Sequence, residues 1–108
     1  IVWGTDDEEQ PSRLTHNRDQ IREGSELVQD YNFIDYWFGT GAERVHARYY
    51  LDDERVTVDP PMKQGESLNL AQARARVPAK ALCFLQRRFG QIDVLTDSGY
   101  ETIWKLPK

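Results

Sequence analysis

Alternating polar side chains between residues 46 and 59 are the group in this sequence best suited to chemistry. They are His46, Arg48, Tyr50, Arg55 and Asp59. A histidine beside an aspartate can act as a general base, arginines can stabilise negative charge on a phosphate, and a tyrosine hydroxyl can donate a hydrogen bond. Such a set could cleave RNA without a metal. Exposed strand faces also carry alternating charges that pair across strands, so the sequence favours a non-enzymatic protein over an enzyme.

The residues around this group predict a β-hairpin over residues 43–59. Its turn would be Asp52 and Asp53, which sets the pairing of the two strands. The expected pairs are His46 with Asp59, Ala47 with Val58, Arg48 with Thr57, Tyr49 with Val56 and Tyr50 with Arg55. With this pairing one face is apolar and the other carries the polar group, as strand alternation requires.

Charge is unevenly distributed along the 108 residues, whose formal net charge is −4. Residues 1–66 hold seven Lys or Arg against fifteen Asp or Glu, whereas residues 67–108 hold seven against three. A basic block without acidic residues falls in the second part and consists of Arg74, Arg76, Lys80, Arg87 and Arg88. Such a block is typical of a surface that binds nucleic acid or another anion. Alternatively, acidic residues of the same domain would neutralise it.

The basic block lies in a segment that predicts two helices followed by a hairpin. Ser67 is a plausible start for a helix over about 68–75, Pro78 turns the chain, and a second helix follows over about 78–89 with Gly90 at its end. The hairpin spans about 91–105 with a loop at residues 97–99, and pairs Ile92 with Trp104, Val94 with Thr102 and Thr96 with Tyr100. This order of elements resembles a winged helix-turn-helix, in which residues 78–88 would be the recognition helix.

An aromatic segment at residues 31–38 predicts a strand, or a transition from helix to strand. Large aromatic side chains in so small a domain are expected mainly in the core. Tyr36 and Trp37 are the candidates for an exposed surface that binds another protein.

The first part of the chain predicts a mobile acidic segment over residues 1–16, with a short edge strand at residues 1–3, followed by a single domain over residues 17–108. Asn17, followed by Gln20 three positions later, matches the capping box of a helix, and we expect that helix over about 18–30. Gly24 would lie inside it and weaken it.

Together these elements predict an α+β domain, built as an antiparallel sheet of two β-hairpins, about 43–59 and 91–105, with helices about 18–30 and 68–89 packed on one face. Cys83 is the only cysteine, which excludes an intramolecular disulfide, and its apolar neighbours predict that it is buried. His16 and His46 lack a metal-binding spacing, so we expect no metal and no cofactor. No apolar run reaches the roughly 18 residues of a membrane-spanning helix, and we expect a cytoplasmic protein without a membrane partner.

Three functions fit these observations. The favoured one is a small non-enzymatic interaction module that binds a protein, as a regulatory, inhibitor or adaptor domain. Its partner would be basic, because the chain is acidic. The alternatives are a nucleic-acid-binding regulator with a winged-helix-like part at residues 68–105, and a metal-independent ribonuclease on the hairpin at residues 43–59. An uncovered edge strand at residues 1–3 or 43–51 would also allow a homodimer.

Overall fold

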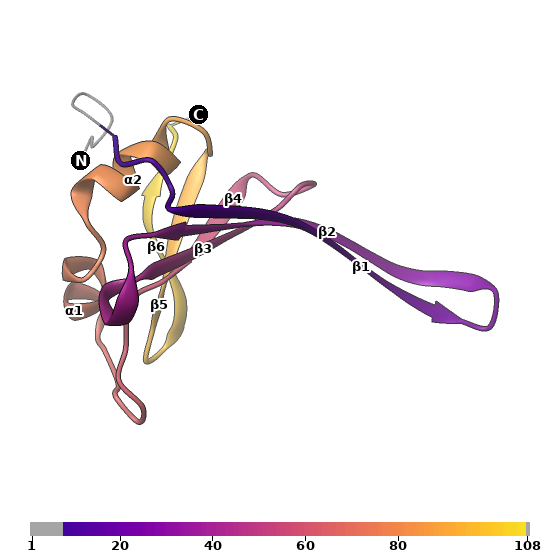
Figure 1. The fold of residues 1–108 in the computed structure, drawn as a ribbon, viewed down its shortest axis with the longest axis horizontal. Helices are drawn as coiled ribbons and strands as arrows, with labels where there is room; N and C mark the ends of the chain where they lie inside the picture. The colour runs from indigo at the N-terminus through magenta and orange to yellow at the C-terminus, as the bar shows by residue number, and fades with distance from the viewer. Residues whose placement is uncertain (1–7, 108) are drawn as a thin grey trace.

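The computed structural model describes residues 8–107, which form a mixed α+β fold dominated by strands. One six-stranded sheet has the strand order β1-β2-β3-β4-β5-β6, and every neighbouring pair is antiparallel except β4 and β5 (Figure 1). The strands are β1 Arg13–Glu23, β2 Glu26–Phe38, β3 Val45–Tyr50, β4 Arg55–Asp59, β5 Gln91–Thr96 and β6 Gly99–Lys105. The helices are the 3-10 helix η1 Gly41–Glu43 and the α-helices α1 Leu70–Ala75 and α2 Ala79–Gln86.

The helix expected over residues 18–30 is wrong, because this region forms most of a β-hairpin made by β1 and β2. Gly24 lies in the turn between the strands with a φ of 64°, a left-handed conformation that glycine adopts without strain. Asn17 does not cap a helix: its side-chain amide donates to Asp35 and Thr15 instead. The capping signal at Asn17 was therefore outweighed by the pairing of both strands within the sheet.

The hairpin of β3 and β4 has four of the five expected pairs, from His46 opposite Asp59 to Tyr49 opposite Val56, and its ladder does not include the fifth, Tyr50 with Arg55. Its turn is held by the Asp53 carboxylate, which accepts from the backbone N–H groups of Glu54 and Arg55. β3 lies between β2 and β4, so the expected edge strand at residues 43–51 is wrong. Within the described sheet the free edges belong to β1 and β6.

The core lies between one face of the sheet and the two α-helices, which lie on the same side of it in Figure 1. The sheet contributes Phe38, Val45, Val58, Ile92 and Val94, among others, and the helical region contributes Ala73, Val77, Leu82, Phe84 and Leu85. Cys83 is buried, as expected. This packing explains why the other face of the sheet is left for polar side chains.

The two helices form inside the expected region of residues 68–89, with different ends. α1 is capped by Asn69 rather than Ser67, in a reciprocal capping box with Gln72. α2 begins after Pro78, as expected, and ends at Gln86, so Gly90 is not its cap. The Gly90 N–H instead donates a hydrogen bond to the Glu54 carbonyl at 3.1 Å.

The pairing expected for the last hairpin is correct for Ile92 and Trp104 only. An irregularity between Ile92 and Asp93 shifts the register, so that Val94 pairs with Glu101 and Thr96 with Gly99. β5 also pairs in parallel with β4. The hairpin thus supplies two of the six strands of the sheet and does not project from the helices as a wing would.

The hairpin of β1 and β2 extends beyond the rest of the sheet as an arm (Figure 1). β2 pairs with β3 only from Phe33 to Phe38, whereas its pairing with β1 reaches Glu26. We call residues 18–32 the arm. It contributes to the elongated outline of the molecule, whose principal extents are 47 × 36 × 27 Å.

The described part of the N-terminal region contacts the body of the protein. The Glu9 N–H donates to the Lys80 carbonyl, and the Ser12 N–H donates to the Trp37 carbonyl. The expected boundary at residue 16 falls inside β1, and the edge strand expected at residues 1–3 lies outside the described residues. Across residues 8–107 no helix is long and apolar enough to cross a membrane.

Candidate functional site

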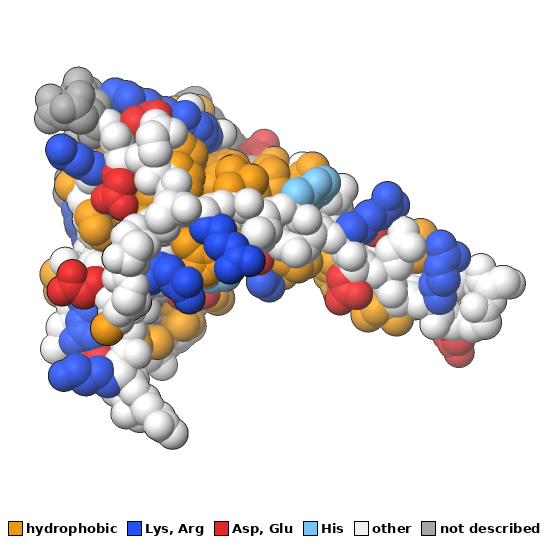
Figure 2. Space-filling view, viewed as in Figure 1, with side chains coloured by type: hydrophobic (Ala, Val, Ile, Leu, Met, Phe, Trp, Pro, Cys, Tyr) orange, Lys and Arg blue, Asp and Glu red, His pale blue; other side chains and the backbone are white. Residues whose placement is uncertain are grey.

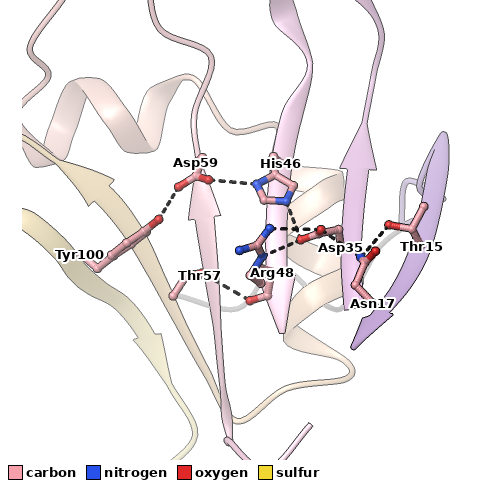
Figure 3. Close-up of polar contacts among 8 residues, drawn as sticks. All are labelled: Thr15, Asn17, Asp35, His46, Arg48, Thr57, Asp59 and Tyr100. Carbon is pink, nitrogen blue, oxygen red and sulfur yellow. Dashed lines mark hydrogen bonds and ion pairs between the residues drawn. The ribbon is translucent and has the colours of Figure 1, made fainter. Parts of the chain in front are cut away.

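A chain of hydrogen bonds crosses the sheet face opposite the helices and links side chains from five strands (Figure 3). It starts on β1, continues through β2, β3 and β4, and ends on β6. In order, its members are Thr15, Asn17, Asp35, His46, Asp59 and Tyr100, with Arg48 bonded to Asp35. The pairing of the strands creates this chain, because residues directly opposite each other point to the same face.

His46 occupies the centre of the chain and contacts a carboxylate with each ring nitrogen. Its Nε2 lies 2.7 Å from Asp35 Oδ1, and its Nδ1 lies 2.9 Å from Asp59 Oδ2. A carboxylate only accepts hydrogen bonds, and histidine has two N–H donors only as the imidazolium. The hydrogen bond to Asp59, together with that to Asp35, raises the pKa of His46 although burial opposes this.

Asp35 is the most enclosed member of the chain, with 7% of its side chain exposed. Arg48 donates to it through Nε at 2.8 Å and Nη2 at 3.3 Å, and Asn17 Nδ2 lies 3.3 Å from Oδ2. Burial acts to raise the pKa of Asp35, but the hydrogen bonds from Arg48 and His46 outweigh it, and the pKa is lowered. The carboxylate is therefore charged and well satisfied, as a buried charge must be.

Asp59 joins His46 to the far edge of the sheet. The Tyr100 hydroxyl donates to Asp59 Oδ1 at 2.6 Å. Burial would raise the pKa of Asp59, but the hydrogen bonds from His46 and Tyr100 lower it. Burial and this hydrogen bond raise the pKa of Tyr100 to about 12. The Asp59 carboxylate thus stays charged, and the Tyr100 phenol stays neutral, over a wide pH range.

Aromatic rings support the charged groups on the same face. The Trp37 ring lies 5.2 Å from the His46 ring, and the Arg13 guanidinium lies 5.1 Å from the Trp37 centroid. Arg48 lies 4.2 Å from the centroid of Phe33. Such cation–π contacts favour the charged forms of these side chains.

The structure brings all five residues of the predicted polar group to one shallow hollow of about 370 Å³, lined by His46, Arg48, Tyr50, Arg55, Thr57, Asp59 and Tyr100. Sequence reasoning missed Asp35 and Tyr100. Alternation along residues 31–38 could have placed Asp35 on the polar face, but the position of Tyr100 depends on the parallel pairing of β4 with β5. No local signal shows that pairing.

The geometry at His46 limits the chemistry of this hollow. An imidazolium that donates both N–H groups to carboxylates has no lone pair with which to take a proton from a substrate. Arg48 is bound to Asp35, and Arg55 forms longer ion pairs with Asp53 at 3.4 Å and Asp93 at 3.5 Å. Among residues 8–107 no cluster of three or more His, Cys, Asp or Glu could hold a metal ion.

The residues of the basic block are distributed over two places and mostly face carboxylates. Arg76 contacts Glu66 with two nitrogens, at 2.5 and 2.7 Å. Arg87 and Arg88 both contact Glu8, at 3.3 and 2.9 Å. Lys80 is exposed and Arg74 is half-buried. Acidic residues from residues 1–66 thus neutralise much of the basic block of residues 67–108.

Tyr36 and Trp37 are the two predicted protein-binding aromatics. The prediction that the Tyr36 side chain is exposed is wrong. Tyr36 is buried in the core, 7% exposed, because alternation in β2 turns it toward the helices. Trp37 lies on the opposite face and is half-buried against His46.

Exposed apolar side chains gather on the arm instead. Ile21, Leu27, Val28 and Tyr31 are between 40% and 52% exposed, and all belong to the arm. The arm in Figure 2 shows apolar surface between acidic and basic side chains. The spacing of apolar residues in this region also suits an amphipathic helix, which is why the sequence predicts a helix here and not an exposed hairpin.

Comparison with known proteins finds no matching family model, no similar curated protein and no similar solved structure.

Proposed function

We propose that this protein is a non-enzymatic module that binds another protein through its arm, as a regulatory, inhibitor or adaptor domain. The observation that carries the proposal is the exposure of Ile21, Leu27, Val28 and Tyr31 on a hairpin that leaves the sheet. The polar chain around His46 then serves to hold the root of the arm on the body of the protein.

The energetics of the arm favour a partner. A two-stranded hairpin without a third strand or a helix against it is only marginally stable in water. Its apolar side chains would gain about 25 cal/mol for each Å² that a partner covers. Binding would therefore stabilise the arm and remove exposed apolar surface in one step.

The charge of the arm's tip favours a basic partner. Glu23 and Glu26 lie directly opposite each other beside the turn, and like charges in such a pair repel. The whole chain also has a formal net charge of −4. A cationic group on the partner would relieve the repulsion at the tip and speed encounter.

A site-specific crosslinking experiment tests the proposal. A photoactivatable residue at Val28 is expected to crosslink one protein in a lysate of the source cells, and the same residue at Leu106 is not. Leu106 is a matched position because it is also apolar and exposed, but lies after β6. Adducts identical at both positions, or none at Val28, would contradict the proposal.

The captured protein is then purified and its affinity measured. Val28→Ser is expected to weaken binding by about ten- to a hundredfold, because burying such a side chain contributes about 1.5 to 3 kcal/mol. Leu106→Ser should leave the affinity unchanged. Circular dichroism of both variants verifies that the fold is retained.

The two alternative functions receive less support. Binding of nucleic acid through the basic block would first require Glu8 and Glu66 to release Arg76, Arg87 and Arg88. A ribonuclease would need a ring nitrogen of His46 to be free. We therefore place both behind protein binding.

We further propose a cytoplasmic location, since a chain with a single cysteine has no intramolecular disulfide and suits a reducing compartment. A homodimer through an edge strand would use β1 or β6, the edges of the described sheet.

A further inference from the structure

We propose that His46, held between Asp35 and Asp59, is a pH-sensitive lock that connects the strands of the arm to the rest of the sheet. The lock is closed while the imidazole carries both protons and opens when one is lost. The effect on a bound partner rests on the proposed function of the arm, whereas the lock itself does not.

The contacts of His46 require the doubly protonated ring. Asp35, on β2, and Asp59, on β4, each approach a different ring nitrogen, at 2.7 and 2.9 Å. A neutral imidazole has one N–H and one lone pair. After loss of a proton, one of the two carboxylates would face a lone pair at hydrogen-bonding distance, and that contact would become repulsive.

Asp59 is the carboxylate expected to move away from His46 when the imidazole loses a proton. Asp35 is held by Arg48 and Asn17, and its side chain is 7% exposed. The Asp59 side chain is 36% exposed and can turn toward water while it keeps its hydrogen bond from Tyr100. Opening of the lock thus divides the polar chain between β3 and β4, and leaves the arm joined to β3 alone on this face.

Charged groups from all the surrounding strands act on the ring. Asp35 on β2 and Asp59 on β4 favour the imidazolium, while Arg48 on β3 opposes it. Arg13 on β1 reaches the ring only through Trp37, and Arg55 on β4 lines the same hollow. Tyr100 on β6 stays neutral over the pH range in question, because its pKa is raised to about 12.

The direction of the pH effect follows from the raised pKa of His46. A raised folded-state pKa stabilises the fold fully below the ordinary histidine value of 6.5. This stabilisation is lost as pH rises through the folded-state pKa. Since one proton is linked, the folding equilibrium constant should fall about tenfold for each pH unit between the two pKa values.

Nuclear magnetic resonance of the imidazole Cε1–Hε1 groups of the full chain tests the lock, without any partner. His46 is expected to titrate above 6.5, and the protection of amides around residues 46 and 59, relative to their intrinsic exchange rates, to fall over the same pH range. His16 provides an internal comparison on β1, where its Nε2 contacts the Asn32 side-chain oxygen.

Matched variants complete the test. Chemical unfolding between about pH 6 and about pH 9 should lose its pH dependence in His46→Gln and keep it in His16→Gln. Asp59→Asn removes one carboxylate and should shift the His46 pKa downward. This pKa tests the lock even if His46→Gln fails to fold. An unchanged pH slope in His46→Gln, or a His46 pKa at or below the ordinary value in the natural chain, would overturn the proposal. Because no partner is present, these results are independent of whether the arm binds a protein.

Discussion

The rings of Tyr36 on β2 and Phe84 on α2 pack edge to face, with centroids 5.7 Å apart and planes inclined by 63°. The Phe89 ring also packs edge to face against Tyr36, with centroids 6.0 Å apart. This contact joins the strand that forms half of the arm to the helical layer. β2 therefore has two roles: its first part extends away from the sheet, and its second part anchors the core.

Replacing Tyr36 by alanine should destabilise the protein by about 3–5 kcal/mol, the range for large aromatic residues removed from a core. The midpoint of urea unfolding measures the effect. Tyr31→Ala is the matched control, since Tyr31 lies on the same strand and is 40% exposed. It should cost far less, because exposed positions leave little cavity behind. Equal losses in both variants would contradict the buried position of Tyr36.

Replacing Asp59 by asparagine should lower the pKa of the Tyr100 phenol from about 12 toward its ordinary value of 10.0. Burial remains in the variant, but the negative charge that holds the phenolic proton is removed. Ultraviolet absorbance of tyrosinate against pH measures the change, and a Tyr100→Phe chain identifies the component that belongs to Tyr100. Asp52→Asn, on the same hairpin, should have no such effect.

Glu66→Gln should quicken tryptic cleavage after Lys63 in the folded protein. Arg76 and the Lys63 N–H bind the Glu66 carboxylate, and these bonds lower the pKa of Glu66 to about 2. A lowered pKa means that the contact is complete above the ordinary value and is lost only as pH falls through about 2. At neutral pH the charge-neutral variant should therefore loosen this loop. Glu54→Gln is the control, and mass spectrometry locates the cut; an unchanged rate would show that Glu66 does not hold the loop.

Labelled duplex DNA and single-stranded RNA should bind no more tightly than about 10⁻⁴ M at physiological salt, because carboxylates already neutralise much of the basic block. Fluorescence anisotropy measures the affinity. The double variant Arg87→Glu/Arg88→Glu should behave like the natural chain. Micromolar binding that weakens with salt and disappears in the double variant would instead support the nucleic-acid alternative.

Features with local signals could be predicted from the order of residues alone. Alternation on both sides of Asp52 and Asp53 specified the pairing of β3 with β4, because a shift of one residue would expose the apolar face. It thereby brought His46 next to Asp59. Pro78 predicted the boundary between α1 and α2, because proline disfavours a helical conformation at the residue before it and is common at a helix start.

Features that depend on residues distant in the sequence could not be predicted in this way, because they follow from the packing of the whole chain. Asn17 and Asn69 are both followed by glutamine three positions later, but only Asn69 caps a helix. Residues 18–30 form strands because β1 and β2 pair along their whole length and β2 continues into the core beside β3. The same holds for the contacts of Asp35 with His46, Tyr100 with Asp59 and Glu8 with Arg88. Burial of the whole apolar layer sets the order of the strands, and that order brings together residues for which no local pattern predicts a contact.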